Sequence, residues 1–175
     1  MFLNKIKLFL LISICLIFFF LTYNDVKSEE IKIISGIAKV TDGDTIRIEG
    51  KKIRFFGIDA PEKKQQCSKP WLTISFLNFN KEYPCGEFSK NKLINLIKNK
   101  SIICKLRNKD IYGRLIAECF KNRININSWM VEHGYAVAYK KYSKKYINQE
   151  NIAKKNKLGL WAGTFEMPWI WRKKN

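Results

Sequence analysis

Residues 31–57 contain three short runs of alternating, mostly β-branched side chains, and this pattern restricts the possible folds more than any other feature of the chain. Two turn sequences separate the runs, Asp-Gly-Asp at 42–44 and Gly-Lys-Lys at 50–52. Short alternating runs divided by Asp and Gly are typical of antiparallel strands joined by tight connections. The sequence therefore predicts a three-stranded antiparallel meander that ends at Ala60-Pro61.

The rest of the chain predicts two further strands and three helices. The helical patterns cover residues 87–100, 126–134 and 143–157, and the strand patterns cover residues 102–106 and 115–120. Three strands, a helix, two strands and two helices is the element order of an OB fold, a small barrel that binds oligonucleotides or oligosaccharides. We therefore expect an α+β domain built on a five-stranded OB-like barrel with three α-helices.

Residues 63–85 differ from their surroundings because their apolar side chains keep no clean period. The dipeptides Lys69-Pro70 and Tyr83-Pro84 interrupt the segment. We therefore predict a long irregular loop, and loops of this length inside a compact domain usually have a function.

The first 28 residues have the organisation of a secretory signal peptide. Lys5 and Lys7 precede an almost wholly apolar run, 8–21, and Val26-Lys27-Ser28 offers a cleavage site before Glu29. A 14-residue helix spans about 21 Å, less than the ~30 Å hydrocarbon core of a bilayer. We therefore favour a cleaved signal over residues 1–28 and a secreted or periplasmic domain over 29–175, with a membrane-anchored protein as the alternative.

The cysteines fit an exported protein. Cys15 lies in the apolar N-terminal run, which leaves an even number, Cys67, Cys85, Cys104 and Cys119. Three pairings are possible, and we favour Cys67–Cys85 and Cys104–Cys119 because each pair brackets one local unit. Each disulfide would stabilise the fold by about 3 kcal/mol. A zinc site is disfavoured, since the chain has no CxxC spacing and one histidine.

The charge of the chain favours an anionic partner. Lys and Arg number 33 against 15 Asp and Glu, which gives a formal net charge of +18. Such a balance favours nucleic acid or an anionic membrane, although a basic surface can also serve solubility alone. Hydrophobic residues make up 46% of the chain, enough for a packed core, which argues against a disordered protein.

Two acidic turns are the strongest candidates for a metal site. Asp42-Gly43-Asp44-Thr45 lies between the first two predicted strands, and Asp59-Ala60-Pro61-Glu62 follows the third. Carboxylates at the ends of neighbouring strands converge, and Asp44 and Asp59 together would attract a hard divalent cation. The alternative is ordinary turn chemistry, in which Asp and Gly are common.

Two arginines are candidates for binding phosphate. Arg54 interrupts the apolar third strand, and Arg114 follows Tyr112-Gly113 at the start of a later strand. The planar guanidinium matches two phosphate oxygens at once. Taken singly, each arginine is also consistent with an ordinary surface residue, because the chain is so basic.

Taken together, four motifs resemble the staphylococcal nuclease (thermonuclease) family. They are Val-Thr-Asp-Gly-Asp-Thr at 40–45, Ile-Arg-Phe-Phe-Gly-Ile-Asp-Ala-Pro-Glu at 53–62, Asp-Ile-Tyr-Gly-Arg at 110–114 and Asn-Lys-Leu-Gly-Leu-Trp at 156–161. The resemblance extends from about residue 37 to Trp161. The Trp-rich tail from about residue 162, through Pro168, Trp171 and Arg172, is similar to that of bacterial periplasmic members.

The resemblance implies a role for each matching residue. Asp44 and Asp59 would be calcium carboxylates, and Ala60 would supply a backbone carbonyl. The catalytic group would be Glu62 as general base, with Arg54 and Arg114 on the scissile phosphate. The nucleotide-binding group would be Tyr112 near a terminal phosphate and Tyr139 or Tyr142 as a stacking surface for a base.

The resemblance also implies the reaction. We expect a Ca²⁺-dependent, monomeric endonuclease that hydrolyses DNA and RNA with low sequence specificity and has no stable membrane partner once the signal is cleaved. The alternatives are a non-catalytic OB module that binds nucleic acid and a membrane-anchored basic adaptor. Two departures from the family bear on substrate choice: Ile111 replaces a lysine, and the segment 63–84 is longer than in the best-known members.

Overall fold

The computed structural model describes residue 7, residues 9–15 and residues 31–175. Residues 9–15 are helical, whereas residues 31–175 form a compact unit of their own. None of the helices in the described part of the chain combines the length and hydropathy that a membrane span requires. Most of the predicted signal peptide falls outside the described residues, so its cleavage stays a prediction.

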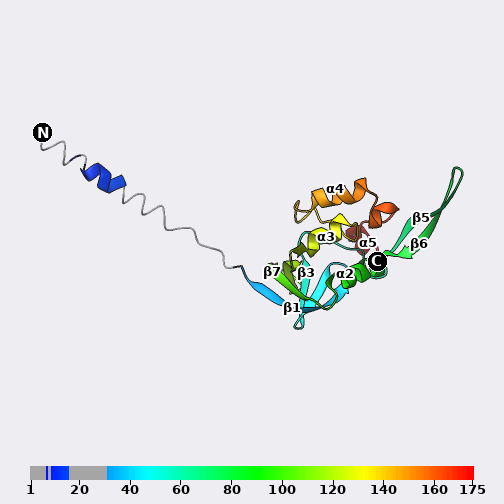
Figure 1. Cartoon of the computed structure of the whole chain (residues 1–175), viewed down its shortest axis with the longest axis horizontal. Helices are drawn as coiled ribbons and strands as arrows, with labels where there is room; N and C mark the ends of the chain where they lie inside the picture. Colours follow the sequence, from blue (N-terminus) through cyan, green and yellow to red (C-terminus); the bar gives the residue numbers. More distant parts are fainter. Residues whose placement is uncertain (1–6, 8, 16–30) are drawn as a thin grey trace. The chain divides into compact units, whose positions relative to one another are not determined.

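Five strands close a ring, as the sequence predicted for an OB-like fold. The meander consists of β1 (Ile33–Asp42), β2 (Thr45–Ile48) and β3 (Lys51–Phe55). β7 (Ser101–Lys109) pairs antiparallel with β1 and with β8 (Leu115–Lys121). The parallel pairing of β8 with β3 then completes the ring, and the short β9 (Ile124–Asn125) extends β8 (Figure 1).

The three predicted helices are present and cover the ring. They are α2 (Cys85–Ile97), α3 (Ile126–Glu132) and α4 (Ile147–Lys155) (Figure 1). Asn125 begins α3, because its side chain accepts a hydrogen bond from the Ser128 N–H at 2.9 Å. The core is formed by fully buried apolar side chains from both strands and helices, including Ile46, Ile53, Phe55, Leu93, Ile102 and Met130.

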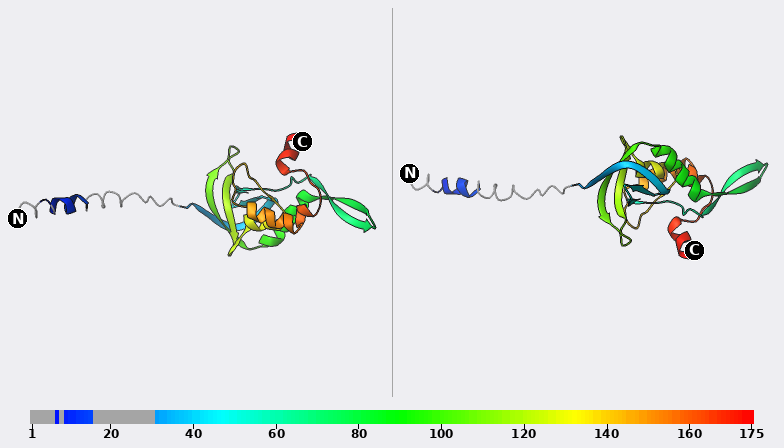
Figure 2. Two further views of the ribbon diagram at one scale, coloured as in Figure 1. Left: turned by 90° about the horizontal axis from the view of Figure 1, so that it is seen from above. Right: turned by 90° about the horizontal axis from the view of Figure 1, so that it is seen from below.

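The prediction of an irregular loop over 63–85 is wrong. This segment forms a long two-stranded hairpin, β5 (Gln66–Ile74) and β6 (Leu77–Pro84), which projects from the body of the domain (Figures 1 and 2). The register shifts between Pro70 and Leu72, and this irregularity breaks the alternation that identifies a strand in a sequence. Proline is tolerated here because an isolated two-stranded ribbon consists of edge strands.

Both disulfides have the pairing that the sequence analysis favoured. Cys67–Cys85 joins the base of the hairpin to the start of α2, and Cys104–Cys119 links partners on β7 and β8. All four cysteines are buried. The remaining one, Cys15, is free and exposed.

The C-terminal tail contains structure that the sequence did not predict. A 3₁₀-helix, η1 (Gly159–Ala162), is followed by α5 (Pro168–Lys174). Between them, Thr164 exchanges two backbone hydrogen bonds with Ser68 at the base of the hairpin, at 2.8 and 2.9 Å. A second small core of Cys67, Cys85, Val137 and Leu160 packs against the tail. The tail is therefore fastened to the hairpin base.

A buried carboxylate on α4 holds a short strand pair that leads to the acidic turns. β10 (Val137–Ala138) pairs with β4 (Ile58–Asp59). The Glu150 carboxylate accepts from the Ala138 N–H at 3.3 Å and lies 2.6 Å from Lys140 Nζ and 2.9 Å from Lys154 Nζ. Burial alone would raise the pKa of Glu150, but the two lysines hold it below its usual value.

We predict that Glu150→Gln lowers the free energy of unfolding by about 2 kcal/mol at neutral pH, because it removes two charge-assisted hydrogen bonds to partly exposed lysines. The pKa of Glu150 is lower in the folded state than in the unfolded state. Its contribution is therefore complete above the usual carboxyl pKa and is lost as the pH falls through the folded-state value.

Urea unfolding between neutral and acidic pH measures this effect. The stability difference between wild type and Glu150→Gln should shrink as the pH falls, and the exposed control Glu82→Gln should follow wild type throughout. A difference that stays constant with pH would contradict the assignment.

Candidate active site

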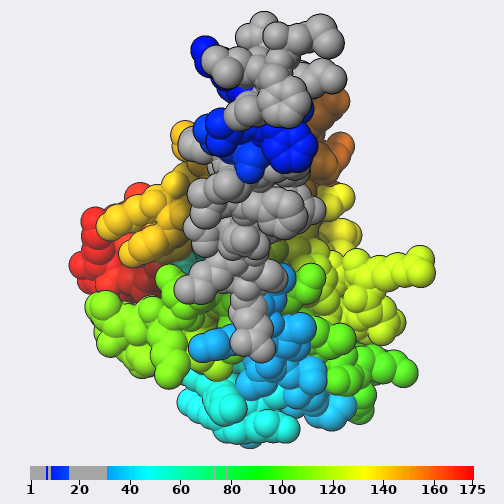
Figure 3. Space-filling view, turned by 90° about the vertical axis from the view of Figure 1, so that its left-hand side faces the viewer, coloured from blue at the N-terminus to red at the C-terminus, as the bar shows by residue number. Residues whose placement is uncertain are grey.

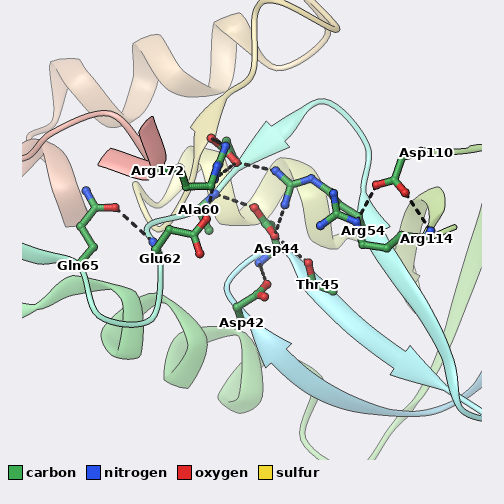
Figure 4. A network of polar contacts seen from close by, with 11 residues as sticks. Asp42, Asp44, Thr45, Arg54, Ala60, Glu62, Gln65, Asp110, Arg114 and Arg172 are labelled. Atoms are coloured by element: carbon green, nitrogen blue, oxygen red, sulfur yellow. Dashed lines mark hydrogen bonds and ion pairs between the residues drawn. The ribbon is translucent and has the colours of Figure 1, made fainter. Parts of the chain in front are cut away.

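The two acidic turns lie at one edge of the ring, where the β1–β2 turn meets the end of β4 (Figure 4). Arg54, on β3, joins them. Its Nη1 lies 2.7 Å from Asp44 Oδ1, and its Nη2 lies 2.5 Å from Asp59 Oδ1. Both carboxylates are buried, so one cationic group is shared by two acids that have little access to water.

Further hydrogen bonds fix the Asp44 carboxylate. The Thr45 hydroxyl donates to Asp44 Oδ1 at 2.9 Å, and the Ala60 N–H donates to Asp44 Oδ2 at 2.8 Å. The Asp44 N–H in turn donates to Asp42 Oδ1 at 3.3 Å. The contact with Ala60 links the two acidic turns directly, so their separation is set by backbone as well as by side chains.

Crowding of the acids shifts their pKa values in different directions. Burial and the Asp44 charge raise the pKa of Asp59, although Arg172 and Arg54 oppose them. Burial and the Asp44 charge also raise the pKa of Asp42, to about 7. Burial would raise the pKa of Asp44 as well, but Arg54 and the Ala60 N–H hold it below its usual value. Asp42 and Asp59 are therefore harder to ionise than free carboxyl groups, because each lies near other negative charge in a buried place.

Helix α2 packs so closely on both acidic turns that two positions require glycine. A Cβ atom at Gly43 would lie 2.1 Å from Ser89 Oγ, and one at Gly86 would lie 1.8 Å from the Glu62 carbonyl oxygen. At Gly86 the neighbour is a backbone atom that cannot move aside, and at Gly43 the Ala60 Cβ, at 2.8 Å, would remain too close even if the Ser89 hydroxyl rotated away. These close contacts fix the positions of the turn carrying Asp44 and of the loop carrying Glu62.

Arg114 lies beside Arg54, on the side away from Arg172 (Figure 4). Its Nε is 2.6 Å from Asp110 Oδ2, and its backbone N–H donates to Asp110 Oδ1 at 2.9 Å. Burial would raise the pKa of Asp110, but the bonds to Arg114 lower it below the usual value. Tyr112 and Ile111 on the same turn are exposed, Ile111 to 92%. The Arg114 guanidinium is 5.5 Å from the Tyr112 ring centroid.

The two candidate stacking tyrosines differ in their surroundings. Tyr139 is stacked on Trp169 of the C-terminal helix, with ring centroids 5.4 Å apart and planes inclined by 9°. The segment around residue 140 and the C-terminal segment accordingly lie side by side in Figure 3. Tyr142 is exposed and meets Tyr139 edge to face at 4.8 Å.

The structure adds two residues that sequence reasoning missed. Arg172 reaches from α5 to Asp59 and Glu62. Gln65, which is fully buried, accepts from the Glu62 N–H at 3.2 Å and donates to the Glu166 carbonyl oxygen at 2.7 Å. Arg172 belongs to the tail that resembles the family, but no motif gives either residue a role in the site, because their partners lie far away in the sequence or on the backbone.

The donors of this site fit a hard cation with oxygen ligands. Asp44 and Asp59 each direct one carboxylate oxygen at the same guanidinium, so one small cation could contact both. Within residues 7, 9–15 and 31–175, no cluster of three or more His, Cys, Asp or Glu has the arrangement of a metal site. Any metal here would therefore depend on two carboxylates, a backbone carbonyl and water.

Comparison with known proteins agrees with the geometry. Residues 52–163 match the family model described as staphylococcal nuclease homologue. The chain is 32% identical over 131 residues to the succinoglycan biosynthesis protein ExoI of Rhizobium meliloti, which covers 73% of this chain and 64% of that protein.

Two further relatives carry names that refer to nucleases. An uncharacterized endonuclease of Escherichia coli O157:H7 is 31% identical over 144 residues, 78% of this chain and 82% of that protein. The probable staphylococcal-like nuclease CAN3 of Oryza sativa is 34% identical over 125 residues, 70% of this chain and 28% of that protein. The chain thus spans less than two thirds of the rhizobial and rice relatives.

Proposed function

The chain belongs to the staphylococcal nuclease family and is a nuclease of the hydrolase class, and on this premise we propose that it is a Ca²⁺-dependent endonuclease acting on DNA and RNA with low sequence specificity. The observation that carries the proposal is the buried pair Asp44 and Asp59, joined by Arg54 and flanked by Glu62. The presence together of Asp44, Arg54, Asp59, Glu62 and Arg114 argues against a non-catalytic binding module, which would not need the whole set.

The metal in this proposal is held by the Asp44 and Asp59 carboxylates and the Ala60 carbonyl. When bound, Ca²⁺ supplies polarisation of the phosphate and orientation of the attacking water. Two crowded carboxylates are stabilised by a divalent cation, because it removes the repulsion that raises the pKa of Asp59.

Glu62 is the general base in this proposal. Hydrolysis joins the water oxygen to phosphorus and breaks the bond to the leaving oxygen, which takes a proton from solvent. Glu62 accepts the proton that the attacking water loses. Its carboxylate is partly exposed, as a group that exchanges protons with water must be, and its backbone is fixed by Gln65.

Arg54 and Arg114 hold the phosphate. Arg54 lies against the metal carboxylates, where a metal-bound phosphate would approach. Arg114 uses Nε for Asp110, and its two terminal nitrogens make no hydrogen bond within residues 31–175, so they are available to phosphate oxygens. Such donors stabilise the negative charge that grows on the phosphate oxygens in the transition state.

Charge and export features support the proposed partner and location. A formal net charge of +18 supports binding through phosphates, which reads no sequence and weakens as salt rises. We propose a monomer that is secreted or periplasmic. The apolar N-terminal run and the two disulfides support that location.

We predict that the chain from residue 29 cleaves single-stranded DNA with Ca²⁺ and not with excess chelator. Glu62→Gln should lower kcat by about 10²–10⁴-fold, because it removes the base. Arg114→Ala should lower it by about 10²–10³-fold, because it removes a phosphate donor. The exposed control Arg123→Ala should retain wild-type activity. Salt-sensitive binding without cleavage under any metal would favour the non-catalytic OB module.

We also predict weak calcium binding, with Kd on the order of 10⁻⁴–10⁻³ M, because two protein carboxylates are few for this ion. Isothermal titration calorimetry measures the value directly. Calcium at about ten times Kd should raise the free energy of unfolding by about 1.4 kcal/mol. Sub-micromolar binding would contradict a two-carboxylate site.

A further inference from the structure

The C-terminal helix brings an arginine into the proposed active site from a distant part of the chain. Arg172 Nη2 lies 2.8 Å from Asp59 Oδ2, and its Nη1 lies 3.1 Å from Asp59 Oδ1 and 2.7 Å from Glu62 Oε1. One guanidinium therefore contacts both a proposed metal ligand and the proposed base (Figure 4). We propose that Arg172 is a positioning residue that holds the Glu62 carboxylate against Asp59. The inference rests on the function proposed above.

The geometry favours positioning over a chance surface contact. A guanidinium is planar and rigid, so a fork that meets both oxygens of Asp59 also fixes the direction from which it meets Glu62. Within residues 31–175, the Glu62 carboxylate makes no other hydrogen bond or ion pair. The orientation of this side chain therefore depends on Arg172.

Helix α5 is itself held in place from two sides. The Gln65 side chain, which fixes the Glu62 backbone, donates to the Glu166 carbonyl oxygen just before the helix. Trp169 stacks on Tyr139, and Pro168 is buried. Arg172 is thus carried by a docked element, and the loop bearing Glu62 and the helix bearing Arg172 share one anchor, Gln65.

The same contact has a consequence for the metal. The Arg172 guanidinium is a positive charge against Asp59, and it opposes the approach of a second cation to that carboxylate. Loss of Arg172 should therefore have two effects of opposite sign: calcium binds more tightly, and turnover falls because Glu62 is no longer oriented. A variant that merely unfolds the site would weaken both.

The test uses the chain from residue 29 with Arg172→Ala, Arg172→Lys and, on the same helix, the exposed control Lys173→Ala. At saturating calcium we expect Arg172→Ala to lower kcat by about 10²-fold with little change in KM. We expect its Kd for calcium, measured by calorimetry without substrate, to fall by about tenfold. Arg172→Lys restores the charge but not the fork, so calcium affinity should return to near wild type while kcat recovers only in part. Lys173→Ala should behave as wild type.

Two results would overturn the proposal. If kcat of Arg172→Ala equals or exceeds the wild-type value, Arg172 does not orient Glu62 for catalysis. Weaker calcium binding in both Arg172 variants, with lower melting temperatures, would show that the arginine only maintains the fold. If wild type itself fails to cleave with any metal, the proposed function fails, whereas the calcium titrations still decide whether Arg172 acts on the acidic pair.

A second observation, independent of the active site, concerns the β5–β6 hairpin. Its distal half exposes six large apolar side chains, Trp71, Leu72, Ile74, Phe76, Leu77 and Phe79. Phe76 at the turn is 86% exposed, and Trp71 is 67% exposed. We also propose that this tip, residues 70–80, inserts into the interface of an anionic lipid bilayer, which revises the expectation that the chain has no stable membrane partner once the signal is cleaved.

Charge and composition favour lipid over other partners. Residues 70–80 contain no charged side chain, and Lys69 and Lys81 pair across the ribbon directly behind them. An uncharged apolar tip followed by lysines suits an anionic lipid surface, where the lysines meet headgroups and the apolar side chains meet acyl chains. Nucleic acid would leave an uncharged tip without phosphate contacts.

The two open edges of the ribbon limit how deep the tip can go. Unpaired backbone N–H and C=O groups are not tolerated in the hydrocarbon core, so only the side chains enter it and the backbone stays among the headgroups. The Cys67–Cys85 disulfide fixes the base of the hairpin on the domain. The domain would therefore be held at the surface through the hairpin, whose base the disulfide fixes.

Vesicle co-sedimentation of the chain from residue 29, which lacks the apolar N-terminal run, tests this second proposal. The protein should bind vesicles of phosphatidylglycerol and phosphatidylcholine, and a Phe76→Ser/Leu77→Ser variant should bind about tenfold more weakly or less. The control Ile37→Ser, which removes an exposed apolar side chain on β1, should bind as wild type. Equal binding of the tip variant, loss of its single-stranded DNA binding instead, or a wild-type dimer that the tip variant abolishes would each overturn the proposal.

Discussion

The repulsion between two buried carboxylates is the constraint on which the rest of this molecule depends. Asp44 and Asp59 come from different turns and meet where there is little water to screen them. The fold meets this demand with guanidinium groups, Arg54 from β3 and Arg172 from the tail. The close packing of α2 at Gly43 and Gly86 keeps the acids from moving apart. The packing of α2 and the two guanidinium groups therefore both hold the Asp44–Asp59 pair in place.

The sequence predicted the parts of the fold that rest on local pattern. The alternation in β1, β2 and β3 and the apolar spacing in α2 and α4 were readable because each element buries one face. In the last helical segment, Tyr146, Glu150 and Ala153 recur at helical spacing and all three are buried. The sequence did not predict the β5–β6 hairpin. Its apolar residues point to solvent on both strands, so no buried face imposes a period, and the shift between Pro70 and Leu72 disturbs what remains.

The sequence predicted those residues of the candidate site that lie in recognisable motifs. Asp44, Arg54 and Asp59 lie within sixteen residues and form one network, as their motifs suggested. Arg114 lies next to that network, but its hydrogen-bond partner is Asp110. Arg172 and Gln65 escaped prediction because their contacts join segments separated by 113 and 101 residues. Only the folded chain brings such residues together.

The distance along the chain between Asp59 and Arg172 has a consequence for how the protein is made. A ribosome releases the acidic turns long before it releases α5, since 113 residues separate them. The ring can close while Asp59 and Glu62 still lack Arg172. We therefore expect the acidic centre to be completed only after the ring has formed, so that a nascent chain passes through a folded but chemically unfinished form.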